Sequence, residues 1–318
     1  MKISVVIPNY NGEEILKKNI PKVVEALRTY QAKSNYAVEL IINDDFSKDN
    51  SIDVLHQLKE KLKNTQVPLF IYQNEKNFGF STTVNRGVRK ASGDLVVLLN
   101  TDVNPQKDFL SPLVENFDDL KVFGVGCVDK SIEGENVVLR GRGVGYWGKG
   151  FLHHEKGDLD STNTFWVSGG SSMFRKSLWD KFGGLDEIYN PFYWEDIDLS
   201  YRAQKAGYKV LFEKRSIVIH EHEKGAIKSK YKPISVQKIA MRNQFIFIWK
   251  NITDTSLLLQ HILWLPYYLL KSILKYDQVF LSGFLKALLL FPKIIQLRIK
   301  ESKLNSISDR EVLAQFNK

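Results

Sequence analysis

The chain has 318 residues, of which 43% are apolar and 25% are charged, and its formal net charge is +9. This is ordinary globular composition and allows a sizeable core. The excess positive charge is local, because residues 224–318 hold 16 Lys and Arg against 5 Asp and Glu. The single cysteine, Cys127, excludes a disulfide framework and favours a reducing compartment.

The N-terminal residues predict a buried strand over 3–7 that ends in the turn Pro8-Asn9-Tyr10-Asn11-Gly12. The apolar run is too short for a signal peptide and stops at a proline, so we expect a protein that is not secreted. Four strands that alternate with helices predict a mostly parallel sheet with helices on both faces. The predicted helices cover 13–30, 50–63 and 81–90, and the remaining strands cover 38–42, 68–72 and 95–99.

After residue 120 the pattern changes to short strand-like runs broken by glycines, which indicates antiparallel and irregular structure built over the sheet. The fold class is therefore α/β. The runs cover 122–128, 136–146 and 164–175, and they are followed by a helix near 196–206 and by strands over 209–212 and 217–220.

From about residue 234 the chain is helical and very apolar. Thr255 to Leu270 is a stretch of 16 residues without a formal charge, fewer than the ~20 that span a bilayer. Cationic, leucine-rich helices of this kind are typical of a segment at a membrane interface, where basic residues are attracted to anionic lipid. A helical cap or a homo-oligomer interface is the alternative, because such helices also bury against protein.

Two acidic signatures carry the chemistry. Asn100-Thr101-Asp102 closes the apolar run 95–99, and the carboxyl ends of strands are where an α/β sheet displays its ligands. Glu195-Asp196 follows two aromatic residues, and a carboxylate there is suited to act as a general base. One signature can hold a cation and the other can take a proton, which together indicate a metal-dependent transferase.

These motifs occur in the order found in one family. The chain resembles the family 2 glycosyltransferases with the GT-A fold, most closely their bacterial rhamnosyltransferase-like branch, over residues 3–222. The resemblance implies a GT-A domain over 1–223, with a nucleotide-binding half (1–120) and an acceptor-binding, catalytic half (121–223), and a basic amphipathic helical extension over 224–318. It rests on segments 5–12, 42–49, 77–81, 85–87, 99–103, 168–171, 182–187 and 194–199, and on Arg202, Gly207-Tyr208 and His220.

The resemblance assigns the nucleotide to the first half. It implies that Pro8, Asn9, Tyr10 and Asn11 hold the base, and that Asp44 accepts the imide N–H of uracil or thymine. An ordinary strand-to-helix turn and a merely solvated Asp44 are the alternatives.

A second nucleotide wall is implied by Asn77-Phe78-Gly79-Phe80-Ser81. Gly79 permits a close backbone approach, and the helix start offers N–H groups to the diphosphate. Asn85 belongs to the same wall by resemblance, with packing of a helix surface as the alternative. Asn100 is implied to contact the ribose or a metal-bound water.

The resemblance makes Asp102 a ligand of Mg²⁺ or Mn²⁺, since such cations take oxygen ligands and usually only one or two carboxylates. Asn100 replaces the first aspartate of the family's metal motif, a departure that weakens the metal assignment. His220 ends the last predicted strand and is implied to complete the metal site or to bind the diphosphate, with a structural histidine as the alternative.

Asp196 is the implied base, with Glu195 beside it as an acceptor or supporting group. Gly169 and Gly170 lack bulky side chains, so a sugar could lie against their backbone. Trp166 and Trp194 could stack on sugar faces, although tryptophan is more often a packing residue.

We therefore expect an inverting, metal-dependent glycosyltransferase that moves a sugar from a UDP- or dTDP-sugar to a hydroxyl of a growing, lipid-linked cell-surface glycan. It would work in the cytoplasm, peripherally bound to the inner face of the plasma membrane, and nucleic acid is not an expected partner. The alternative is a catalytically silent nucleotide-sugar-binding scaffold. A nucleotidyltransferase is disfavoured, because residues 8–12 contain one glycine and no basic residue to hold a triphosphate.

Overall fold

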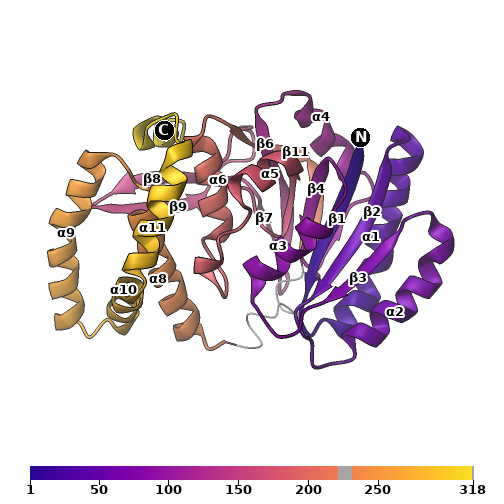
Figure 1. The fold of residues 1–318 in the computed structure, drawn as a ribbon, viewed down its shortest axis with the longest axis horizontal. Coiled ribbons are helices and arrows are strands. Elements are labelled where there is room, and N and C mark those ends of the chain that lie inside the picture. The colour runs from indigo at the N-terminus through magenta and orange to yellow at the C-terminus, as the bar shows by residue number, and fades with distance from the viewer. Residues whose placement is uncertain (221–230, 317–318) are drawn as a thin grey trace.

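The computed structural model describes residues 1–220 and 231–316 (Figure 1). The first half alternates strand and helix as predicted, because each apolar run has the length of one buried strand and a helix-forming segment follows it. The elements are β1 Lys2–Asn9, α1 Glu13–Ser34, β2 Ala37–Asp44, α2 Ser51–Leu62, β3 Leu69–Gln73, α3 Phe80–Lys90 and β4 Leu95–Leu99.

The second half differs from the prediction in three places. The strand predicted over 136–146 is divided at Gly141, whose φ of 133° interrupts the ladder. Only the end of the run 164–175 is a strand, and the last two predicted strands are one strand with a register shift. The elements are β5 Val103–Pro105, α4 Leu110–Glu115, β6 Val122–Glu133, β7 Asn136–Arg140, β8 Gly143–Gly148, β9 Phe151–Lys156, β10 Ser171–Arg175, α5 Lys176–Phe182, α6 Glu195–Lys205 and β11 Lys209–His220.

The main sheet has the strand order β3-β2-β1-β4-β10-β6-β11-β5, with β7 paired to β6, while β8 and β9 form a separate two-stranded sheet. β3, β2, β1 and β4 pair in parallel, and β10 runs antiparallel to both of its neighbours. One apolar cluster joins the sheet to α1 and α2, and another joins its opposite face to α3 and α5. The predicted α/β fold with helices on both faces is confirmed.

The C-terminal helices share a core with the second half of the chain. One apolar cluster contains Phe165 and Tyr201 together with Phe245 and Phe247, and the rings of Tyr201 and Phe247 lie 5.1 Å apart. In Figure 1 these helices stand beside β8 and β9, at the end opposite α2. The predicted boundary at 223–224 lies outside the described residues. The helices are α8 Pro233–Asn251, α9 Thr255–Leu274, α10 Gln278–Leu289, α11 Phe291–Glu301 and α12 Asp309–Ala314.

One helix of the described residues, α9, is long and apolar enough to cross a membrane. It has 20 residues, because the helix continues past Leu270 to Leu274, so the predicted shortfall in length is not confirmed. α10 and the segment 291–304 pass the same test as one span bent by 67°. The length and composition of α9 therefore permit contact with a membrane.

Candidate active site

A cleft of about 400 Å³ opens at the carboxyl edge of the parallel strands. Its walls come from the ends of β1 and β4, the start of α3, and the loops that precede β10 and α6. The structure therefore brings residues from both halves of the domain to one place, as the motifs predicted. Among the predicted site residues, the cleft is lined by Pro8, Asn9, Tyr10, Asn77, Gly79, Asn100, Asp102, Gly169, Gly170, Glu195, Asp196 and His220.

The carboxylate that lines the cleft after β2 is Asp45, one residue beyond the predicted Asp44. Asp44 is fully buried and is not among the cleft residues; its carboxylate accepts from the Asn9 side chain at 2.7 Å and from Ser47 N at 2.9 Å. Asp45 lines the cleft and accepts the N–H groups of Phe78 and Gly79, each at 2.9 Å. β2 ends at Asp44 and Asp45 follows it in the loop, so the two carboxylates have different neighbours.

Two further predicted residues do not line the cleft. Asn11 faces the segment after β2, where its side-chain oxygen accepts from Lys48 N at 2.8 Å. Asn85 is buried, and its amide exchanges hydrogen bonds with the backbone of Leu185 at 2.7 and 3.0 Å. Asn85 therefore ties α3 to the loop after α5. Its amide takes part in packing, which was the alternative to the predicted contact with the nucleotide.

Gly170 allows a close approach between β4 and the loop that precedes β10. Asn100 N donates to Gly170 O at 2.9 Å, and a Cβ atom on Gly170 would lie 2.4 Å from Asn100 Nδ2. Any larger residue at position 170 would displace the Asn100 amide from the cleft.

His220 lies between two carboxylates at the end of β11. Its Nε2 is 3.2 Å from Asp102 Oδ1, and its Nδ1 is 2.9 Å from Asp129 Oδ2. Burial disfavours the imidazolium, but hydrogen bonds and charge from both carboxylates outweigh burial and raise the pKa of His220 to about 9. Sequence reasoning missed Asp129, which no motif marks.

The Asp102–His220 pair fits a hard divalent cation. Two adjacent ligands at about 2.1 Å in an octahedral site lie about 3 Å apart, close to the 3.2 Å between Asp102 Oδ1 and His220 Nε2. A metal-binding histidine commonly has its other ring nitrogen held by a carboxylate, and Asp129 is placed to do this. Once the imidazole gives up the proton that it shares with Asp102, the donor atoms suit the predicted Mg²⁺ or Mn²⁺.

Glu195 and Asp196 begin α6 and face the cleft. Asp196 accepts from Gly169 N at 3.2 Å and from Ile197 N at 2.8 Å, which orients its carboxylate. Oε2 of Glu195 is buried and has no hydrogen-bond partner among the described residues. Burial raises the pKa of Asp196, and burial together with the charge of Asp196 raises the pKa of Glu195 well above its ordinary value.

A family model described as glycosyl transferase family 2 matches residues 4–183. The chain belongs to glycosyl transferase family 2. An uncharacterized glycosyltransferase of Nostoc sp., alr2836, is 35% identical over 125 residues, which are 39% of this chain and 35% of that protein. The O-antigen chain rhamnosyltransferase RfbN of Salmonella typhimurium is 25% identical over 227 residues, 70% of this chain and 67% of RfbN. The aligned part of the chain spans about a third of the length of the Nostoc relative.

Solved structures of glycosyltransferases share the fold. S. aureus TarS 1–349 in complex with UDP-GlcNAc matches with a TM-score of 0.59 at 16% identity, over 99% of this chain and 91% of that chain. The mannosyltransferase PcManGT from Pyrobaculum calidifontis, in complex with GDP-Man and Mn²⁺, matches with a TM-score of 0.56 at 16% identity, over 98% and 86%. At these identities the likeness establishes the GT-A-like fold of this family 2 glycosyltransferase.

In this family 2 glycosyltransferase the C-terminal helix α8 holds the loop that leads to Glu195. Asn243 is fully buried, and its Nδ2 donates to the carbonyls of Tyr189, Phe192 and Tyr193 at 2.9, 3.0 and 2.8 Å. Arg242 Nη2 adds bonds to the carbonyls of Tyr189 and Asn190 at 3.2 and 2.7 Å.

The same loop contains a left-handed pair. Tyr193 and Trp194 have φ values of 71° and 77°, which are uncommon for residues with a side chain and persist only where the surroundings enforce them. We did not predict that α8 takes part in the site, because the predicted role of the extension was at a membrane.

Trp166 and Trp194 pack inside the domain and are not among the residues that line the cleft. Both rings approach His154 edge-on, at 5.2 and 5.1 Å, and Trp194 also lies 5.2 Å from the ring of Phe247. The predicted stacking on sugar gives way to core packing, because the large rings bury more apolar surface there.

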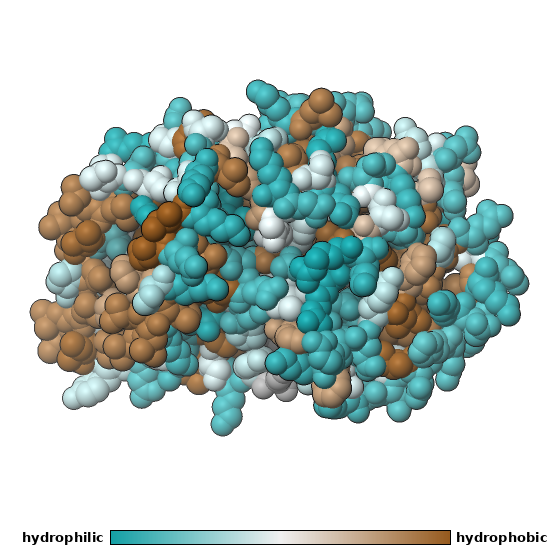
Figure 2. Space-filling view, in the orientation of Figure 1, coloured by the Kyte–Doolittle hydropathy of each residue, from teal (hydrophilic) through white to brown (hydrophobic). Residues whose placement is uncertain are grey.

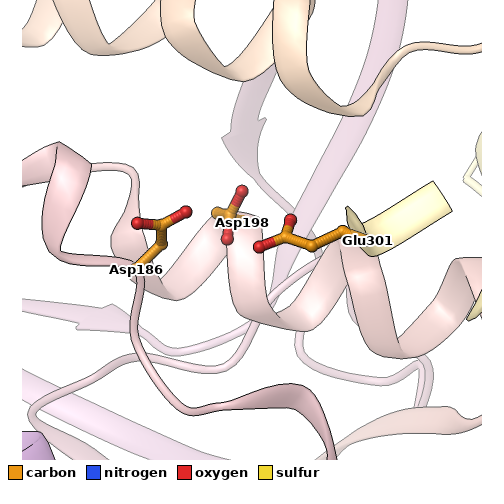
Figure 3. A group of neighbouring side chains, drawn as sticks. All are labelled: Asp186, Asp198 and Glu301. Carbon is orange, nitrogen blue, oxygen red and sulfur yellow. The ribbon is translucent and has the colours of Figure 1, made fainter. Parts of the chain in front are cut away.

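Figure 3 shows the carboxylates of Asp186, Asp198 and Glu301 pointing toward one another, with ligand atoms within 4.8 Å. The ammonium group of Lys250 lies among them, at 2.7, 2.8 and 2.9 Å from their oxygens, and Arg202 pairs with Asp198 at 2.7 Å. The positive charges of Lys250 and Arg202 therefore compensate these carboxylates, and we assign the cluster a structural role rather than metal binding. It fastens α6 to α8 and α11.

Proposed function

We propose that this family 2 glycosyltransferase transfers a sugar, with inversion at the anomeric carbon, from a nucleoside diphosphate sugar to a hydroxyl of a growing glycan. The observation that carries the proposal is that one cleft joins the Asp102–His220 pair to the carboxylates of Glu195 and Asp196. A site for a cation and a site for a proton thus flank a volume of about 400 Å³, which is adequate for a small ligand.

The donor is a UDP-sugar or a dTDP-sugar. Asp45 is placed on the wall formed by the ends of β1 and β2, where its carboxylate can accept the imide N–H of uracil or thymine. Support comes from the similar fold of TarS, which was solved with UDP-GlcNAc. Asn77 and Gly79, just before α3, line the part of the cleft suited to the ribose and diphosphate.

Asp196 is the general base. It takes the proton of the acceptor hydroxyl while the hydroxyl oxygen forms a bond to the anomeric carbon, and the bond from that carbon to the diphosphate oxygen breaks on the opposite face. A positioned base of this kind contributes ~10²–10⁴-fold to the rate. The bonds from Gly169 N and Ile197 N fix the Asp196 carboxylate. Burial and the charge of Asp196 raise the pKa of the neighbouring Glu195.

Asp102 and His220 would hold Mg²⁺ or Mn²⁺, which when bound neutralises charge on the leaving diphosphate. The donor set fits by its spacing, and the similar fold of PcManGT was solved with Mn²⁺. Asp129 would keep the His220 ring oriented with Nε2 toward the cleft.

The acceptor is a lipid-linked cell-surface glycan, and the enzyme acts in the cytoplasm at the inner face of the plasma membrane. Two observations support this placement. RfbN, similar over 70% of this chain, is named as an O-antigen chain rhamnosyltransferase, and α9 is apolar along its length.

The experiment is release of nucleoside diphosphate by the purified chain from a panel of UDP-, dTDP- and GDP-sugars, each with Mn²⁺, Mg²⁺ or EDTA. Metal-dependent release from a UDP- or dTDP-sugar supports the proposal and names the sugar. Release of GDP alone would overturn the donor assignment. Metal-dependent nucleotide binding without turnover, even with lipid-linked glycan added, would favour a catalytically silent scaffold.

A further inference from the structure

α9 exposes one continuous apolar face. Leu259, Leu263, Tyr267, Leu270 and Leu274 recur at spacings of three and four residues, so they lie along one side of the helix. Leu263 is 77% exposed and Leu274 is 70% exposed, so no part of the described chain covers them. Figure 2 shows apolar residues gathered at the end of the molecule formed by α9 and α10. A face of this kind marks a contact with a membrane or a protein.

The opposite side of α9 is fastened to the domain. His261 is 3% exposed, and its ring contacts Gly150 O at 2.7 Å and the indole N–H of Trp249 at 3.0 Å. Leu257 and Ser272, nearly a helix length apart, are also buried. A helix packed on protein along one side cannot be surrounded by lipid, so α9 is suited to lie in the plane of a membrane surface.

A pocket of about 270 Å³ adjoins this face. Its apolar wall is made by Phe151, Tyr268 and Phe280, whose rings contact one another, and Lys271 and Lys275 stand at its edge one helical turn apart.

The pocket also carries positive charge, and the ammonium group of Lys271 lies 5.8 Å from the centre of the Tyr267 ring. Its one acidic lining residue, Asp277, is the cap of α10, and its carboxylate accepts from the N–H groups of Val279 and Phe280, both at 3.0 Å. Within residues 1–220 and 231–316, no carboxylate lies within ion-pair distance of Lys271, Lys275 or Lys286. An apolar pocket with a cationic edge suits an amphipathic anion.

Charge decides between the possible occupants of this face. A second copy of the chain would bring the same lysines toward the same apolar stripe, and like charges would oppose each other. An anionic bilayer offers both an apolar interior and a negative surface, and each lysine near that surface gains attraction.

We propose that the exposed face of α9 and its lysine-edged pocket bind a bilayer that contains anionic phospholipid. The headgroup phosphate lies between Lys271 and Lys275, and the leucines of α9 enter the acyl region. This inference rests on the proposed function for its membrane-borne acceptor. Its test uses neither donor nor acceptor, so lipid binding and glycosyl transfer can fail separately.

The experiment is co-sedimentation of the full chain with phosphatidylcholine vesicles, with and without phosphatidylglycerol. We expect binding that requires phosphatidylglycerol and that weakens about thirty-fold in the double variant Lys271→Gln, Lys275→Gln. The matched control is Lys59→Gln with Lys61→Gln, two exposed lysines on α2, at the far end of the molecule in Figure 1. This control should bind as the unchanged chain does.

A second variant, Leu263→Asn with Leu270→Asn, tests the apolar face at two largely exposed positions. We expect it to lose vesicle binding while its melting temperature is unchanged. Equal binding to both vesicle types, or full binding by the lysine variant, would overturn the proposal. A dimer in solution that the leucine variant disrupts, without vesicle binding by either form, would assign the face to a second copy instead.

Discussion

Replacement of Asn243 by alanine tests how the C-terminal helices control catalysis. The Asn243 amide donates to three carbonyls of the loop 189–193, and one of these, Tyr189 O, also accepts from Arg242. In the variant, the carbonyls of Phe192 and Tyr193 therefore lose their hydrogen bonds from α8, while Tyr189 O keeps its bond from Arg242. At about 1 kcal/mol for each hydrogen bond, the loop conformation that places Asp196 loses about 2 kcal/mol.

That loss lowers the equilibrium constant between the placed and the displaced loop by roughly thirty-fold, so we expect kcat to fall by up to roughly thirty-fold. The affinity for UDP or dTDP should be unchanged, because the proposed nucleotide wall is formed by the ends of β1 and β2 and the residues at the start of α3. The assay is metal-dependent donor hydrolysis, with nucleotide binding measured by titration.

The matched control is Gln204→Ala, which removes another buried amide, one that donates to Phe165 O at 2.8 Å from the far end of α6. Both variants should lose stability, but only Asn243→Ala should lose kcat beyond the loss of stability. Equal kcat values in the two variants would refute the positioning role of Asn243.

Three further results are expected. Burial raises the pKa of Asp196, so the base is still protonated where an ordinary aspartate is ionised. In a plot of kcat/KM against pH, the acidic limb should therefore have its midpoint above about 4, the ordinary pKa of aspartate. A midpoint at the ordinary value would contradict the assignment of Asp196 as the base. Lys250→Met leaves Asp198 and its neighbours without their shared cation, which should cost about 3–5 kcal/mol of unfolding free energy in denaturant titration; an unchanged midpoint would contradict this. Gly170→Ala places a methyl group against Asn100. It should weaken nucleotide binding, measured by titration, with little change in melting temperature. An unchanged nucleotide affinity would contradict the placement of Asn100 in the nucleotide site.

Local sequence patterns predicted the first half of the fold well. The strands over 3–7, 38–42, 68–72 and 95–99 are short apolar runs bounded by turns, and each is a strand of the parallel sheet. β10 was not predicted as an antiparallel strand between β4 and β6, because its partners are set by contacts far along the chain. The division at Gly141 required a backbone angle that the residue type permits but does not impose.

The motifs predicted which segments meet in the cleft better than which side chains face it. Asp44 ends β2 and Asp45 follows it, and the register of β1 against β2, which pairs Asn9 with Asp44, places the Asp44 carboxylate against the Asn9 side chain. Asn243 could not be found by motif, since it belongs to a helix without a signature. Its one signal was an amide beside the apolar run 245–249.

The measurement that tests the central claim most directly compares the unchanged chain with Asp196→Asn, using the donor that the panel selects. Turnover and donor affinity would both be measured with the metal present. The account predicts that Asp196→Asn binds the donor as tightly as the unchanged chain, while release of nucleoside diphosphate falls by at least ~10²-fold. Undiminished release by Asp196→Asn would contradict the assignment of Asp196 as the base and of this cleft as the site of transfer.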